Sequence, residues 1–208
     1  MRRSVRGICL IAVLCLGALS CASRQPIRGQ EASDLDRKLS TYAFIEEGDL
    51  VTFIVGTRAT RYRGKEDPYI PIEICISNNG QRRLILTRES FTLIDEEGNR
   101  YPAANPRELM GGYDFLDVDR DGLSELREIV FNKFSAYTRY QSKFSPTNMA
   151  SSQSQNLVRD MVSLPRYGYI IDFVYFPTPK TGVKDHRFEL FLESPDLPDP
   201  VFLKFIVE

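Results

Sequence analysis

An alternation of isoleucine with other residues over positions 70–77 limits most strongly what this chain can fold into. The isoleucines are Ile70, Ile72, Ile74 and Ile76. Because successive side chains of a strand point to opposite faces, the spacing predicts a β-strand with one face in an apolar core. Cys75 then points to the other face, towards solvent or a second layer. The following Asn78-Asn79-Gly80 predicts a hairpin turn with positive φ angles, with Leu84 and Leu86 on the returning strand.

The same two-residue period recurs on both sides of this strand. It is found at residues 51–55, 91–93, 188–192 and 201–207. Residues 169–176 are apolar on both faces apart from Asp172, which is typical of a central strand. Seven or eight short strands with turn signals between them predict an antiparallel β-sandwich.

These strands resemble the immunoglobulin-like domains of uncharacterised bacterial lipoproteins. The resemblance is carried by the isoleucine-rich strand, the Asn-Gly turn and a Phe-x-Leu-x-Asp-x-x-Gly hairpin formed here by Phe91, Leu93, Asp95 and Gly98. It covers most of residues 48–102 and 167–207, and the disulfide and tryptophan of antibody domains are absent. It implies a mainly β fold, an immunoglobulin-like antiparallel β-sandwich over residues 46–208 with an α-helical insertion.

The insertion spans residues 103–166, where the strand rhythm stops. Asn105-Pro106 is a plausible start for a short helix that Gly111-Gly112 ends. Apolar residues recur at helical spacing over 126–134, and a second helix is expected over 157–162, ended by Pro165. Between them, the Ser-, Gln- and Asn-rich residues 141–156 predict a mobile loop. The insertion is therefore the expected place for features specific to this protein.

One metal-binding pattern lies inside the insertion. Residues 117–128 match D-x-D-x-D-G-x₅-E, the calcium loop of EF-hands, in which alternate residues of a tight loop turn oxygens towards the ion. The predicted ligands of one structural Ca²⁺ are Asp117, Asp119, Asp121, the Leu123 carbonyl, Glu125 and Glu128. Ser124 replaces the usual aliphatic residue and the incoming helix is poor, so the segment resembles solitary strand–loop calcium sites of exported proteins. In that variant Glu125 is the last ligand. The alternative is an acidic, solvated turn.

The N-terminus has the parts of an export signal: Arg2, Arg3 and Arg6, then an apolar run over 8–19. The run is too short to span a membrane. Its ending, Ala-Leu-Ser-Cys, resembles a bacterial lipobox. This implies that residues 1–20 are a signal peptide and that Cys21 carries lipid, as the membrane attachment. An ordinary cleaved signal and an uncleaved anchor are the alternatives. Residues 21–45 are then a flexible tether, and Ala22 resembles an outer-membrane address.

Charge and cysteine content exclude several classes. The net charge is −1, and it becomes −4 once the three signal arginines are removed, which gives no electrostatic case for nucleic acid. Of the four cysteines, Cys75 alone remains free in the mature chain, so no intramolecular disulfide forms. Two basic stretches, 58–65 and 137–143, are expected to be solvated, with anionic lipid or cell-wall polymer as the alternative contact.

No catalytic motif is recognisable. His186, the single histidine, is expected in a solvated turn, and the chain is expected not to be an enzyme. The first hypothesis is a lipid-anchored binding or structural module of the cell envelope, stabilised by one calcium ion, with an envelope protein or polymer as its unknown partner. The alternatives are an accessory lipoprotein of an envelope complex without metal, and a hydrolase acting on an envelope polymer.

Overall fold

A six-stranded sheet forms the middle of the described chain, which comprises residues 38–121, 124–142, 144–145 and 161–208 of this computed structural model. Its order is β1 (Lys38–Ser40), β2 (Ala43–Glu47), β3 (Val51–Gly56), β4 (Tyr69–Asn78), β10 (Gly168–Pro177) and β8 (Thr138–Arg139). All neighbours are antiparallel except β10 and β8. The prediction of a central strand over 169–176 is confirmed, because β10 lies between β4 and β8.

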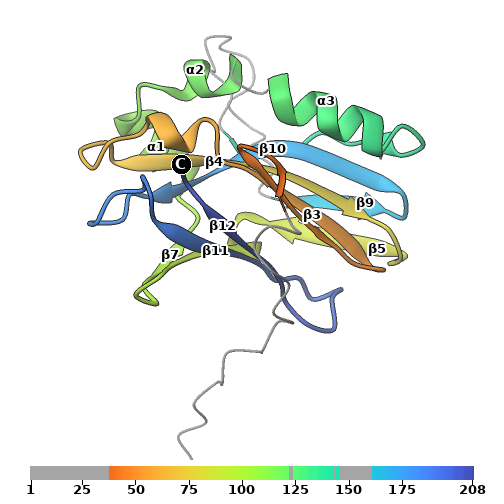
Figure 1. Cartoon of the computed structure of the whole chain (residues 1–208). Helices are drawn as coiled ribbons and strands as arrows, with labels where there is room; N and C mark the ends of the chain where they lie inside the picture. Colours follow the sequence, from red (N-terminus) through yellow and green to blue (C-terminus); the bar gives the residue numbers. More distant parts are fainter. Residues whose placement is uncertain (1–37, 122–123, 143, 146–160) are drawn as a thin grey trace, which may run out of the picture. The chain divides into compact units, whose positions relative to one another are not determined.

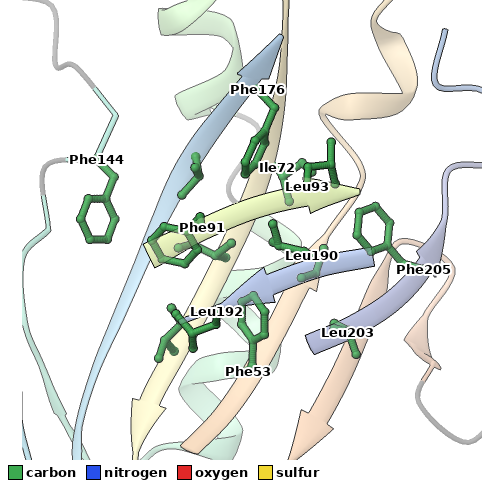
Figure 2. Packing of buried hydrophobic residues seen from close by; sticks show 14 of the residues in the cluster. Phe53, Ile72, Phe91, Leu93, Phe144, Phe176, Leu190, Leu192, Leu203 and Phe205 are labelled. Carbon is green, nitrogen blue, oxygen red and sulfur yellow. The ribbon is translucent and has the colours of Figure 1, made fainter. Parts of the chain in front are cut away.

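Two smaller sheets pack on one face of this sheet. One contains β12 (Val201–Ile206), β11 (Arg187–Leu192), β6 (Phe91–Asp95) and β7 (Arg100–Pro102), and the other contains β5 (Arg83–Thr87) and β9 (Met161–Pro165). Their inward side chains share one apolar core with Phe53, Ile72 and Phe176 of the large sheet (Figure 2). The described chain is thus mainly β, in several open sheets. The expected alternation of faces holds, since all four isoleucines of β4 pack in this core while Cys75 packs in another, although β4 is buried on both faces.

Helices cover the other face of the large sheet (Figure 1). They are α1 (Pro106–Gly112), α2 (Leu116–Asp121) and α3 (Ser124–Lys133). The apolar side of α3, with Leu126 and Val130, and Phe134 directly after the helix pack in a second core with Cys75 and Phe173 of the sheet. Cys75 therefore faces this second layer and not solvent, and the Cys75 side chain is fully buried.

Two local expectations in the middle of the chain are wrong. The segment after β4 does not fold back on β4, because β5 pairs with β9 instead. Neither Asn78 nor Gly80 has a positive φ. The second helix expected to end at Pro165 is absent from its described part, where residues 161–165 form strand β9. Val162 and Leu164 alternate there with exposed residues, so the two-residue period prevails over the helical one.

The sheet also begins earlier than expected. Strand β1 and the first three residues of β2 fall within residues 21–45, the stretch assigned to a tether. Ala43, Phe44 and Ile45 are buried, because β2 pairs with β3 and has both faces covered. No helix in the described residues is long and apolar enough to cross a membrane.

Candidate functional site

The predicted calcium ligands are spread over two helices in the described structure. Asp117 and Asp119 lie in α2, where residues two positions apart point in directions about 200° apart. Accordingly Asp117 is exposed and Asp119 is buried. Glu128 is exposed on α3. Leu123 and the side chains of Asp121 and Glu125 lie outside what the structure describes.

The predicted ligands that lie within the described residues are not arranged as a calcium loop requires. A loop site needs alternate carboxylates to converge, and a helical backbone separates them. Among the described residues, no group of three or more His, Cys, Asp or Glu side chains is close enough to hold a metal ion. Calcium binding therefore stays a prediction.

Asp119 instead joins a buried polar cluster with Arg63, Tyr113 and Tyr175. Arg63 follows the 3₁₀ turn η1 (Thr60–Tyr62), and its Nη2 donates to Asp119 Oδ1. Arg63 Nε donates to the Tyr113 hydroxyl at 2.8 Å, and that hydroxyl donates to Asp119 Oδ2 at 2.7 Å. The Tyr175 hydroxyl of β10 also hydrogen-bonds to Asp119. Three separate segments of the chain are thereby joined at one carboxylate.

Burial dominates the electrostatics of this cluster. It raises the pKa of Asp119 above its ordinary value, although Tyr113 and Arg63 act in the opposite direction. Burial also acts to lower the pKa of Arg63, but the charges of Asp119 and Tyr113 and the hydrogen bonds to both together outweigh it, so the net shift is upward. Burial and the bonds to Asp119 raise the pKa of Tyr113 and Tyr175. The cluster therefore keeps Arg63 charged and both tyrosines neutral across the physiological range.

Aromatic rings close the cluster from solvent. Arg63 lies over the Phe115 ring at 4.3 Å, and the ring centroids of Tyr113 and Tyr175 are 5.4 Å apart. Arg63 is only 9% exposed, so its expected place in a solvated basic stretch is wrong. Sequence reasoning missed Arg63, Tyr113 and Tyr175, because no local signal links η1 to α2. In the sequence Arg63 is one of several basic residues in the stretch 58–65, so nothing distinguished it.

A second buried carboxylate, Asp172 of β10, holds the segment after β8. Its Oδ2 accepts hydrogen bonds from Ser142 Oγ and from the Phe144 amide, both at 2.8 Å. Arg88 donates from Nε and Nη2 to the Phe144 carbonyl. Burial raises the pKa of Asp172 and lowers that of Arg88 to about 10. These contacts place the Phe144 ring in the core against Phe91 (Figure 2).

The remaining candidates are peripheral or lie outside the described residues. Cys21, the predicted lipidation site, lies outside them. His186 lies in a partly exposed turn, as expected, with its Nδ1 2.6 Å from Glu96 Oε1.

Comparisons with known proteins give one structural similarity. No family model matches the chain, and no curated protein matches it. A crystal structure described as a "putative lipoprotein (ycdA)" from Bacillus subtilis aligns with 78% of this chain at 11% identity and a TM-score of 0.40. The alignment spans 38% of that protein.

Proposed function

We propose that this chain is a lipid-anchored module of the bacterial cell envelope that binds or supports a partner and does not catalyse a reaction. The observation that carries the non-catalytic part is the Arg63–Asp119 cluster. Ionisable groups with shifted pKa values that converge in one place often mark an active site. Here their polar atoms bond to one another under a cover of rings, an arrangement suited to fixing the helices on the sheet.

The anchoring part rests on the sequence. The Ala-Leu-Ser-Cys ending of the signal supports lipidation of Cys21, and Ala22 supports delivery to an outer membrane. The immunoglobulin-like character of the sandwich belongs to the same proposal, supported by the confirmed Phe91–Gly98 hairpin between β6 and β7. Because Arg63 hydrogen-bonds to Asp119, this contact supports the version of the proposal in which the module holds no metal ion.

The experiment is metabolic labelling of cells with radioactive palmitate, followed by separation of inner and outer membranes. We expect label in the parent protein, recovered with the outer membrane. Cys21→Ala should carry no label and leave the membrane fraction, whereas the control Cys75→Ser should keep both properties. Equal labelling of Cys21→Ala, or recovery of the parent in the soluble fraction, would exclude the lipid anchor.

A further inference from the structure

Two turns with basic and aromatic side chains lie at the same end of the sheets. One links β4 to β5 and leads into Arg82 and Arg83, and the other links β9 to β10 through Arg166 and Tyr167. They meet because β5 and β9 are antiparallel partners, with Arg83 opposite Pro165. Arg82 and Arg166 are the next residues beyond this pair, so both turns project from one end of the β5–β9 ribbon.

Asn78 fixes these turns to each other. Its side chain is fully buried, and Nδ2 donates to the Leu164 carbonyl at 2.9 Å and to the Gln81 carbonyl at 3.0 Å. Its Oδ1 accepts from the Gln81 amide, and its carbonyl accepts from the Tyr167 amide at 2.7 Å. One amide side chain thus satisfies backbone groups of both turns, which gives them a defined relative position.

A pocket of about 580 Å³ opens beside the first turn. It is lined by Gln81, Arg82, Arg83, Ser163, Pro165 and Asp196. The Asp196 carboxylate is held in place by the Ile85 amide, which donates a hydrogen bond to its Oδ2 at 2.7 Å. Arg82 and Arg83 are exposed, and within the described part of the chain neither side chain forms a hydrogen bond or an ion pair. With two arginines and one carboxylate among its lining residues, the pocket has a net positive charge.

The second turn presents an aromatic ring at a conformational cost. Tyr167 has a φ of 62°, in the left-handed region that a bulky side chain rarely adopts and that strains the backbone. Its side chain is 48% exposed. The Tyr137 ring contacts it edge-on at 5.4 Å, and the Arg166 guanidinium lies 4.9 Å from its centroid. A glycine or asparagine would satisfy this backbone more easily, so the exposed ring needs another reason to be there.

We infer that this end of the molecule binds an acidic polysaccharide. Arg82 and Arg83 supply planar donors for carboxylate or phosphate groups, and Gln81 and Ser163 can hydrogen-bond to sugar hydroxyls. Tyr167, held by Tyr137, offers a rigid face for the apolar side of a sugar ring. Because these groups extend over two turns, they suit an extended chain better than a single small anion. This inference deepens the proposed envelope function by naming the class of partner.

A polymer accounts for the geometry better than a membrane surface does. Attraction to anionic lipid takes a cluster of about four to eight basic residues, whereas here two arginines line a concave pocket and Arg166 lies in the neighbouring turn. Acidic peptides could pair with the arginines but would make no distinct use of the exposed ring and the hydroxyl-binding groups. Both alternatives enter the test as competing ligands.

The test is titration calorimetry of the full lipidated protein in neutral detergent, with oligogalacturonate as the probe. Neutral dextran oligosaccharides, poly-glutamate and phosphatidylglycerol vesicles are measured in parallel. We expect oligogalacturonate to bind more tightly than all three, with an affinity that falls as salt is added. Arg82→Gln/Arg83→Gln should weaken binding about tenfold or more, and Tyr167→Asn should weaken it several-fold, with melting temperatures close to the parent.

Matched variants separate a site from general charge. Arg107→Gln/Arg127→Gln removes two exposed arginines from the helices, and Tyr62→Asn removes a 66% exposed ring elsewhere. Both should bind like the parent. The inference is overturned if they weaken binding as much as the site variants, if poly-glutamate or vesicles bind as tightly, or if oligogalacturonate does not bind. Such a failure would leave the palmitate experiment, which reads out Cys21 in cells, unaffected.

Discussion

Arg63 donates a hydrogen bond to the carboxylate of Asp119, which lies 56 residues further along the chain. Both side chains are almost wholly buried. The pKa of Asp119 is nevertheless raised, since burial outweighs the attraction of Arg63. The pair therefore specifies where the helices dock more than it adds net stability.

The first prediction concerns this pair. Asp119→Ala leaves the buried guanidinium without its anion and should lower the free energy of unfolding by about 3 kcal/mol. The double variant Arg63→Met/Asp119→Leu removes both charges and should recover most of that loss. Urea unfolding of the parent, of Arg63→Met, of Asp119→Leu and of the double variant measures the coupling energy of the pair. If the losses of the single variants simply add, the two side chains do not interact in solution.

The second prediction concerns calcium. Asp119 can ligate an ion only after it leaves Arg63, so millimolar calcium should raise the melting temperature of the parent little. Arg63→Met frees the carboxylate and should show a larger rise, whereas Asp119→Ala should show none. Melting curves in calcium and in chelator give the comparison. The absence of a rise in all three proteins would contradict the calcium prediction and leave residues 117–128 as an acidic turn.

The third prediction concerns pH and the β6–β7 hairpin. Asp95 accepts hydrogen bonds from the amides of Glu97 and Asn99, from the Asn99 side chain and from the Tyr101 hydroxyl. Burial acts to raise its pKa, but these bonds prevail and the net shift is downward. The ionised carboxylate thus stabilises the fold fully above the unfolded-state pKa, about 3.9, and this contribution is lost as the pH falls through the lower folded-state pKa.

Asp95→Asn should therefore cost about 1 kcal/mol at neutral pH. The difference between parent and variant should shrink below about pH 4, where the parent carboxylate becomes protonated. Chemical denaturation at several pH values measures it. A difference that is constant from pH 7 to pH 2.5 would show that the charge of Asp95 does not matter. Glu193→Gln, an exposed change, is the control.

The fourth prediction contrasts two glycines. A Cβ at Gly80 would lie 2.8 Å from the Asp49 carbonyl oxygen, so Gly80→Ala should cost about 1–3 kcal/mol through steric overlap. A Cβ at Gly111 meets nothing within 4 Å, and Gly111 lies in α1. Gly111→Ala should therefore stabilise the protein by about 0.5–1 kcal/mol. Thermal unfolding should shift in opposite directions. A higher melting temperature for Gly80→Ala would mean that the β4–β5 turn is packed differently. A lower one for Gly111→Ala would contradict the open surroundings of Gly111 in α1.

Local patterns were enough to predict individual elements. The isoleucine alternation predicted β4, and the apolar stretch before Pro177 predicted β10 as a central strand. The start of α1 was also predictable, since the Asn105 side chain accepts from the Arg107 amide at 2.9 Å and Pro106 is the first helical residue. Each of these signals lies within a few residues of its effect.

Pairing between distant segments was not predictable from those signals. Asn78 looked like a turn residue, and its role as a bridge depends on Leu164, 86 residues away. Strand β9 is too short for its two-residue period to stand out from the helical spacing expected before it. The candidate calcium ligand Asp119 shows the same limit, because a motif match says nothing of the arginine that folding brings to it.

The position of Cys75 gives the protein a chemical reporter of its own motion. Its thiol lies between the sheet and α3, and burial raises its pKa, so a thiol reagent can reach it only when the helices lift from the sheet. The rate of labelling in native conditions then measures the free energy of that opening. Comparison with the rate of global unfolding would tell whether the helical layer detaches as a separate unit while the packed sheets stay intact.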